Sequence, residues 1–185
     1  MKWLFLTLLW LHFASHAQGF AGLGSNAEGF FVPNPDRALV FPKDHGAHED
    51  YRIEWWYLTA NLKTADGTPY GLQWTLFRSA LRLGEGEAWH SSQLWMGHAA
   101  VTTPDHQYVS ERLGRGGIGQ AGVTVDAQFD AWIDDWHLRG SNNLNELAMR
   151  AVGNDFAYEM DLSARGPLVL QGNAGYSVKS AAGQA

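Results

Sequence analysis

Residues 45–62 read HGAHEDYRIEWWYLTANL and form the least ordinary run of the sequence. A polar lead-in with two histidines precedes a segment of aromatic and aliphatic residues, which is typical of a β-strand. Side chains of a strand alternate between its faces, so Trp55 and Tyr57 share one face while Glu54 and Trp56 share the other. Because both faces carry large apolar side chains, we expect both to be covered, as in a barrel or a sandwich.

Glu54 is the exception in this segment, since it places a carboxylate between Ile53 and Trp55. Three environments would explain it: contact with water, a cationic partner such as Arg52 or Arg78, or an apolar pocket that favours the protonated acid. We favour a paired, structural carboxylate, because buried charges are usually paired.

The composition of the 185-residue chain indicates one aromatic-rich β domain. Nine Trp, nine Phe and six Tyr favour strands and ligand-contact walls, and 21 Gly indicate many turns. The net charge is −6 with no dense basic patch, so nucleic acid and anionic membrane surfaces are poor candidates as partners. The chain has no cysteine, and its stability must therefore come from packing without disulfides.

Residues 1–17 have the features of a secretory signal peptide. One Lys precedes a short apolar run, and Ser15-His16-Ala17 fits a small-x-small cleavage pattern. We expect cleavage after Ala17, a periplasmic or secreted location and no stable membrane span. An uncleaved N-terminal anchor is the alternative, because the charged region holds a single Lys.

Residues 18–44 form an N-terminal arm, in which three prolines argue against a helix. The domain itself covers residues 45–185. Asp66-Gly67 predicts a hairpin turn between strands at 52–62 and 70–78, with Trp55 or Trp56 across from Leu72, Trp74 or Leu76. Further strands are predicted at 91–102, 106–113, 129–139, 146–152, 156–163 and 168–171, and a mobile surface loop at 114–122. A single strand over 129–139 places Trp132 and Trp136 on one face.

This pattern predicts an all-β fold, either an antiparallel β-barrel or a strongly bent sandwich of about eight strands. Barrel closure would remove the exposed strand edges. The hydrogen-bonding capacity of every strand would then be satisfied within the domain.

The chain resembles the AttH/carotenoid 1,2-hydratase-like family, whose members are also described as predicted secreted hydrolases with lipocalin-like domains. The resemblance spans roughly residues 41–179 and rests on Phe41-Pro42-Lys43-Asp44-His45-Gly46-Ala47-His48, Arg52-Ile53-Glu54-Trp55-Trp56-Tyr57, Gly71-Leu72-Gln73, Phe77-Arg78, His98-Ala99-Ala100, Trp132, Asp135-Trp136 and Leu170-Gln171-Gly172-Asn173-Ala174-Gly175-Tyr176-Ser177. It implies a lipocalin-like fold. Family members resemble two consecutive lipocalin-like domains, so it also implies that this chain is the N-terminal half and that the second domain is absent.

The resemblance implies two classes of function. The first is a secreted module that binds an apolar ligand, a lipid or an isoprenoid, with a neighbour in an export system as a further partner. The second is an enzyme that needs the missing half: a hydro-lyase adding water to a carotenoid-type double bond, or a secreted hydrolase. Hydration needs a protonated acid and aromatic faces that stabilise a cation, and no cofactor. Hydrolysis has less support, because the chain has neither a Gly-x-Ser-x-Gly elbow nor a Cys nucleophile.

The candidate site residues are polar or aromatic side chains of the predicted strands. Glu54 and His98 are the candidate catalytic groups, although a histidine in an apolar strand is more often a core or cavity-facing residue. The candidate ligand-binding residues are Trp55, Trp56, Tyr57, Gln73, Trp74, Arg78 and Trp95. His45 and His48 lack a defined third metal ligand, so we predict no metal and expect one imidazole to lie against the strand that carries Glu54.

Overall fold

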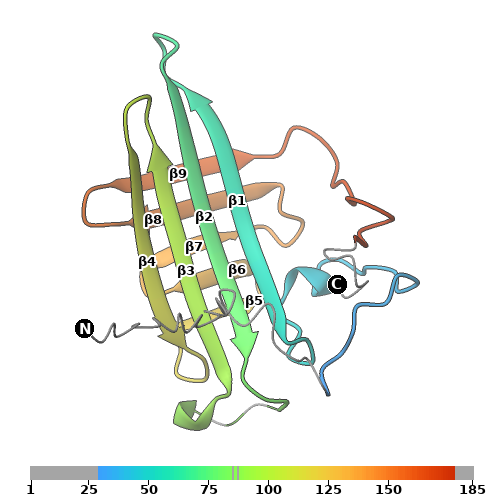
Figure 1. Cartoon of the computed structure of the whole chain (residues 1–185). Helices are drawn as coiled ribbons and strands as arrows, with labels where there is room; N and C mark the ends of the chain where they lie inside the picture. Colours follow the sequence, from blue (N-terminus) through green and yellow to red (C-terminus); the bar gives the residue numbers. More distant parts are fainter. Residues whose placement is uncertain (1–28, 85, 87, 178–185) are drawn as a thin grey trace, which may run out of the picture.

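The computed structural model describes residues 29–84, 86 and 88–177, and in this part of the chain all regular structure is β apart from two short 3₁₀ helices (Figure 1). The predicted signal peptide, residues 1–17, lies outside the described residues. The strands form two antiparallel sheets, and within each sheet every pairing joins strands that are consecutive in sequence. The all-β prediction is therefore confirmed.

The first sheet has the order β1-β2-β3-β4 and the second the order β5-β6-β7-β8-β9. The first consists of β1 (Ile53–Lys63), β2 (Pro69–Ala80), β3 (Gln93–Thr102) and β4 (Gln107–Arg115). The second consists of β5 (Ala121–Thr124), β6 (Phe129–Ile133), β7 (Trp136–Gly140), β8 (Glu146–Val152) and β9 (Ala157–Ser163). The 3₁₀ helices are η2 (Lys43–His45) and η3 (Ala88–His90).

The predicted hairpin of β1 and β2 sets the geometry of the first sheet. Gly67 turns the chain with a φ of +88°, a conformation that glycine adopts without steric penalty. The resulting register pairs Trp56 with Leu76 and Glu54 with Arg78. Side chains directly across an antiparallel pair are within reach of one another, so the register alone brings the Glu54 carboxylate to the Arg78 guanidinium.

Alternation along the strands divides the aromatic residues of β1 between the core and the surface. Trp56 packs against the core, whereas Trp55 and Tyr57 on the opposite face are 42% and 65% exposed. The expectation that both faces of this strand are covered is therefore wrong for the outer face. The core between the sheets is closed by fully buried side chains, the largest being Trp74, Trp136, Leu76, Ile133 and Met149.

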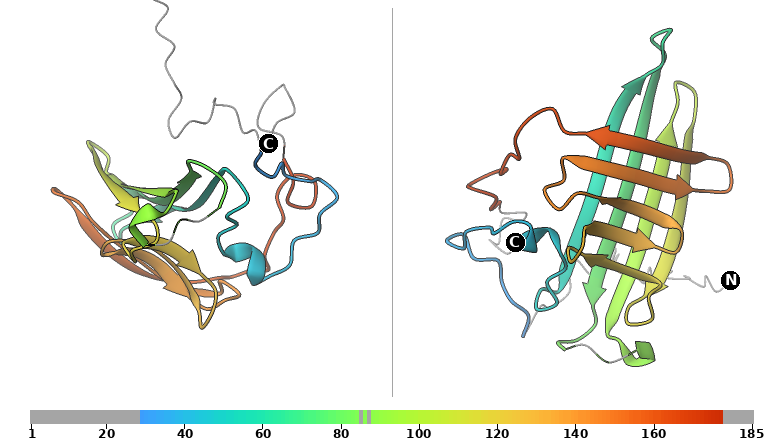
Figure 2. Two further views of the ribbon diagram at one scale, coloured as in Figure 1. Left: turned by 90° about the horizontal axis from the view of Figure 1, so that it is seen from below. Right: turned by 180° about the vertical axis from the view of Figure 1, so that it is seen from behind.

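The structure is a sandwich, and among the described strands no pairing joins the two sheets into a closed barrel. The strands of the first sheet run across those of the second (Figures 1 and 2). The two sheets come close at Gly97 and Gly114, where an added Cβ would meet Ile133 at 2.8 and 3.2 Å. These glycines let the layers pack without an intervening side chain.

Two strand predictions are wrong. The segment 129–139 is two strands, because Asp134, with a φ of +53°, makes a tight turn between β6 and β7. Trp132 consequently lies on the outer face against Gly122, while Trp136 is fully buried. Residues 168–171 form no strand. The predicted loop 114–122 is shorter than expected, because β4 extends to Arg115 and β5 begins at Ala121.

The N-terminal arm and the segment after β9 lie side by side on the flank of β1 (Figures 1 and 2). Gly175 packs against Leu39, with which an added Cβ would collide at 2.7 Å. The arm also contacts the segment that leads into β1, through the amide of Phe31, which donates to the carbonyl of Asp50. Among the described residues, no helix has the length and apolar character needed to cross a bilayer.

Candidate functional site

A cavity of about 430 Å³ lies between the arm, the edge of β1 and the segment after β9. Its apolar walls come from Pro33, Leu39, Ile53, Trp55, Trp56 and Tyr176, and its polar lining includes Arg37, Asp44, His48 and Glu54. The cavity is therefore formed largely by segments outside the core of the sandwich, beside the Glu-Trp-Trp-Tyr segment of β1.

Arg78 anchors the polar side of this cavity from within the first sheet. Its guanidinium, only 1% exposed, donates from Nε to Glu54 Oε2 at 3.0 Å and from Nη1 to Gln93 Oε1 at 2.6 Å. Nη2 donates to the carbonyl oxygens of His48 and Tyr51 at 2.6 and 2.7 Å. A charge this deeply buried requires such complete pairing, and one arginine thus fixes both Glu54 and the chain that leads into β1.

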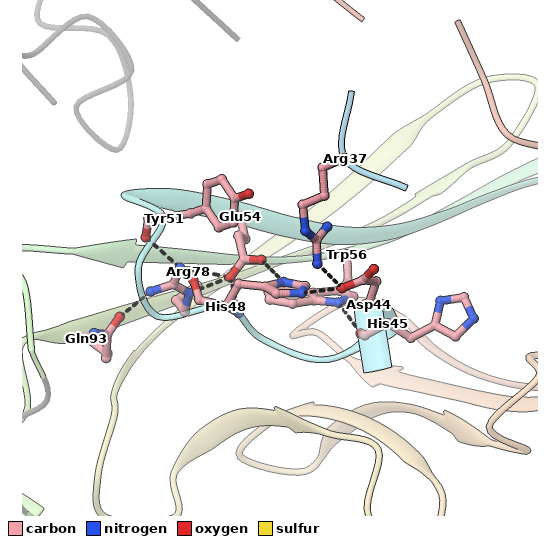
Figure 3. Close-up of polar contacts among 9 residues, drawn as sticks. All are labelled: Arg37, Asp44, His45, His48, Tyr51, Glu54, Trp56, Arg78 and Gln93. Atoms are coloured by element: carbon pink, nitrogen blue, oxygen red, sulfur yellow. Dashed lines mark hydrogen bonds and ion pairs between the residues drawn. The ribbon is translucent and has the colours of Figure 1, made fainter. Parts of the chain in front are cut away.

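His48 lies between two carboxylates and ties the arm to β1 (Figure 3). Its Nδ1 is 2.7 Å from Glu54 Oε1 and its Nε2 is 3.0 Å from Asp44 Oδ1. A neutral imidazole has one N–H, so both contacts are hydrogen bonds only when the ring is protonated. Asp44 in turn accepts from Arg37 Nη2 and from the amide of Val40, both at 2.5 Å. The series Arg37, Asp44, His48, Glu54 and Arg78 alternates in charge, and we call it the ionic chain.

The ionic chain shifts the pKa values of two of its members. The hydrogen bond to Glu54 raises the pKa of His48 above the ordinary 6.5; burial opposes this rise, and Asp44 adds to it. Burial by itself would raise the pKa of Asp44, but donation from Val40, Arg37 and His48 lowers it to about 2. Asp44 therefore stabilises the fold above pH 3.8, its ordinary pKa, and this contribution is lost as the pH falls towards 2.

We expect the stabilisation by His48 to disappear in alkaline solution. Because the folded-state pKa is raised, the contribution is complete below pH 6.5 and is lost as the pH rises through the folded-state value. Urea unfolding of the wild type and of His48→Gln between about pH 6 and pH 9 measures this. The difference in unfolding free energy between the two should shrink as the pH rises. A difference that is constant over this range would contradict a protonated His48.

Trp56 joins the cavity to the core. Its Nε1 donates to the carbonyl of His45 at 2.9 Å, and its ring stacks on Trp95 with centroids 5.9 Å apart. The ring of His45 in turn stacks on Phe41 of the arm, with centroids 4.3 Å apart. Phe41 is thus linked to β1 through His45, in addition to the ion pairs of the ionic chain.

The structure brings together part of the predicted site. Glu54, Trp55 and Trp56 line the cavity, and Arg78 holds Glu54 from behind. Glu54 is paired with Arg78, one of the two predicted cations, and His48 is the imidazole expected against its strand. The other predicted ligand-binding residues, which do not line the cavity, are Trp74 and Trp95 in the core and Tyr57 and Gln73 on the exposed face of the first sheet.

His98 is separated from Glu54 by the sheet. It lies on β3 opposite Thr75, and its ring contacts Phe77 with centroids 5.5 Å apart and approaches Glu111 at 4.0 Å. These neighbours belong to the outer face, whereas Glu54 points to the other side. The structure thus gives the two predicted catalytic groups no shared site.

Sequence reasoning missed Arg37, Asp44 and Tyr176 as lining residues. Arg37 lies in an aperiodic, proline-bearing segment, and Tyr176 is more than a hundred residues away from β1 in sequence. The available signal was the polar lead-in itself, in which Asp44 and His48 are four residues apart. Within the described part of the chain, no group of three or more potential ligands is placed to hold a metal ion.

Comparison with known proteins identifies the family. A sequence profile of the AttH-like family matches residues 32–185. A crystal structure of a protein named as an AttH candidate from Nitrosomonas europaea is 31% identical to this chain, with a TM-score of 0.67. The match covers 84% of this chain and 47% of that protein, so the chain spans about half the length of that relative. No curated protein matches the sequence. The chain belongs to the AttH-like family.

Proposed function

We propose that this domain binds an apolar small molecule, a lipid or an isoprenoid, in the cavity beside β1. The observation that carries the proposal is the cavity itself, whose volume of about 430 Å³ falls within the range typical of ligand pockets. Two tryptophans and a tyrosine supply walls of the kind that bury apolar ligands. The side chains at the centre of the core between the sheets are fully buried.

The proposal includes a periplasmic or secreted location, based on the signal-peptide features of residues 1–17. Export through the membrane would place the domain where lipids are handed between carriers, so a neighbour in an export system is the partner that we propose. Both parts rest on sequence alone.

Hydration of a carotenoid-type double bond is the second candidate, and the geometry gives it less support. Glu54 accepts hydrogen bonds from the amide and ring of His48 and from Arg78. These donors engage both oxygens of the carboxylate, so the arrangement favours a positioning group over a proton donor. An enzyme of this kind would need its acid elsewhere, in a protein as long as the relative from Nitrosomonas europaea.

Trp55→Ala tests the cavity as the binding site. We expect the full chain to bind the neutral apolar probe N-phenyl-1-naphthylamine saturably, and the substitution to weaken binding about fivefold, which corresponds to loss of about 1 kcal/mol of aromatic contact. The fluorescence of the probe, titrated with protein, gives the Kd. Because Trp55 is 42% exposed, the variant should remain folded.

Tyr57→Ala is the matched control, because Tyr57 lies two residues further along the same face of β1 and does not line the cavity. Its Kd should equal that of the wild type. Equal Kd values for the two variants, or no saturable binding at all, would count against this cavity as the site.

A further inference from the structure

The ionic chain gives the polar end of the cavity its charges. Two cations, Arg37 and His48 in its protonated form, and two carboxylates, Asp44 and Glu54, line the cavity, and Arg78 lies behind Glu54 outside the lining. Each carboxylate is held between two cations of the ionic chain, whereas Arg37, at the end of the series, is paired with one carboxylate.

The exposure of these side chains decides which charges a ligand would meet. The side chains of Asp44 and Arg78 are each 1% exposed and are closed off by their partners. Glu54 and His48 are 16% and 22% exposed, while Arg37 is 40% exposed. The most accessible charge in the cavity lining is therefore a cation, and the most buried carboxylate lies beneath it.

Arg37 keeps donors that the described contacts do not use. Among the described residues, the guanidinium of Arg37 has a single acceptor, Asp44, to which it donates from Nη2. A guanidinium has five N–H donors in a planar fork that suits a carboxylate or a phosphate. Arg37 lines the cavity and its side chain is 40% exposed, so the remaining donors are accessible to a ligand head group.

We infer that the ligand is an amphiphile with an anionic head group, which Arg37 binds at the polar end of the cavity while the hydrocarbon lies against Leu39, Trp55, Trp56 and Tyr176. This inference rests on the proposed function and names the chemical class of its ligand. A cationic head group would face Arg37 and His48, and a neutral one would leave the outer donors of Arg37 to water. Charge therefore selects among apolar molecules that fit equally well.

Three probes with the same hydrocarbon chain and different head groups test the inference: dodecanoate and dodecylammonium below their micelle-forming concentrations, and dodecanol below its solubility limit. Their Kd values for the full chain are obtained by displacement of the neutral naphthylamine probe near neutral pH. We expect dodecanoate to bind about tenfold more tightly than dodecanol, the lower end of what a hydrogen bond to a charged group gives. Dodecylammonium should bind most weakly.

Arg37→Gln should abolish the preference for dodecanoate over dodecanol, so that the two probes bind with equal affinity. The matched control is Arg139→Gln: Arg139 is 43% exposed, lies 3.6 Å from Asp130 and is not part of the cavity lining. This control should bind all three probes like the wild type. Arg37→Lys, which keeps the charge, should retain most of the preference for dodecanoate.

The outcomes separate the two proposals. If dodecanoate and dodecanol bind equally to the wild type, the anionic head group is wrong and the apolar site stands. If Arg37→Gln weakens both probes by the same factor, Arg37 acts by holding the arm, and the head-group contact is overturned. If none of the probes, including the naphthylamine, binds saturably, the proposed function itself fails.

Discussion

Replacing Arg78 with Met should lower the free energy of unfolding by about 3 to 5 kcal/mol, the range for breaking a buried ion pair from one side. Methionine fills a similar volume, so the loss reflects missing partners more than a void. The substitution leaves the Glu54 carboxylate, the Gln93 amide oxygen and the carbonyls of His48 and Tyr51 without their donor. Urea unfolding of wild type and variant measures the difference.

Two further variants are needed to interpret the loss of stability in Arg78→Met. Adding Glu54→Gln to Arg78→Met removes the carboxylate charge that has lost its arginine partner and should recover part of the loss. Arg150→Met is the matched control, because Arg150 pairs with Glu159 at 2.9 Å on a surface where it is 36% exposed; it should lose about 0.2 to 1 kcal/mol. A loss from Arg78→Met no larger than that of the control would show that the buried arginine does not organise the site.

Trp136→Ala should cost about 3 to 5 kcal/mol, because it empties the centre of the core. The ring is fully buried, its Nε1 donates to the carbonyl of Val152 at 2.9 Å, and the guanidinium of Arg112 lies 4.5 Å from the ring centroid. The same residue packs under Gly97, where the two sheets approach each other. The loss therefore combines the transfer energy of the indole with a cavity at the point of closest packing.

Trp89→Ala provides the comparison, since Trp89 is 67% exposed on η3. Its unfolding free energy should lie within about 0.5 kcal/mol of the wild-type value. Thermal melts and urea titrations of Trp136→Ala and Trp89→Ala measure the two changes in stability. Similar stabilities for the two would mean that the sheets repack around the missing ring, contrary to the close approach at Gly97.

Local sequence patterns predicted the elements that local geometry controls. The Asp66-Gly67 turn and the alternation on either side of it predicted the β1–β2 hairpin. The same alternation predicted that Glu54 and Trp56 lie on one face of β1 and Trp55 and Tyr57 on the other. Arg78 was one of two candidate partners for Glu54 because both lie in this hairpin. The register then decided between them.

The remaining features of the fold and the site depend on contacts that the alternation of side chains along a strand does not reveal. The turn at Asp134 requires a left-handed backbone conformation at a residue other than glycine, which the sequence does not signal. The sequence pattern therefore predicted a single strand over 129–139. Whether nine strands form a barrel or a sandwich depends on pairing between distant strands. The alternation of side chains along one strand gives no information about that pairing. Arg37 and Tyr176 reach the cavity from irregular segments and Asp44 from the short helix η2, and only their position in space makes them neighbours.

The neighbour-to-neighbour order of both sheets bears on how the protein folds. Each pairing joins strands that follow one another, so each can form between segments that are close in sequence; the longest connection within a sheet is the one from Ala80 to Gln93. Two separate meanders can therefore form early, during or soon after synthesis. Their face-to-face docking, which requires the bare backbone at Gly97 and Gly114 to meet Ile133, is then the step expected to set the folding rate.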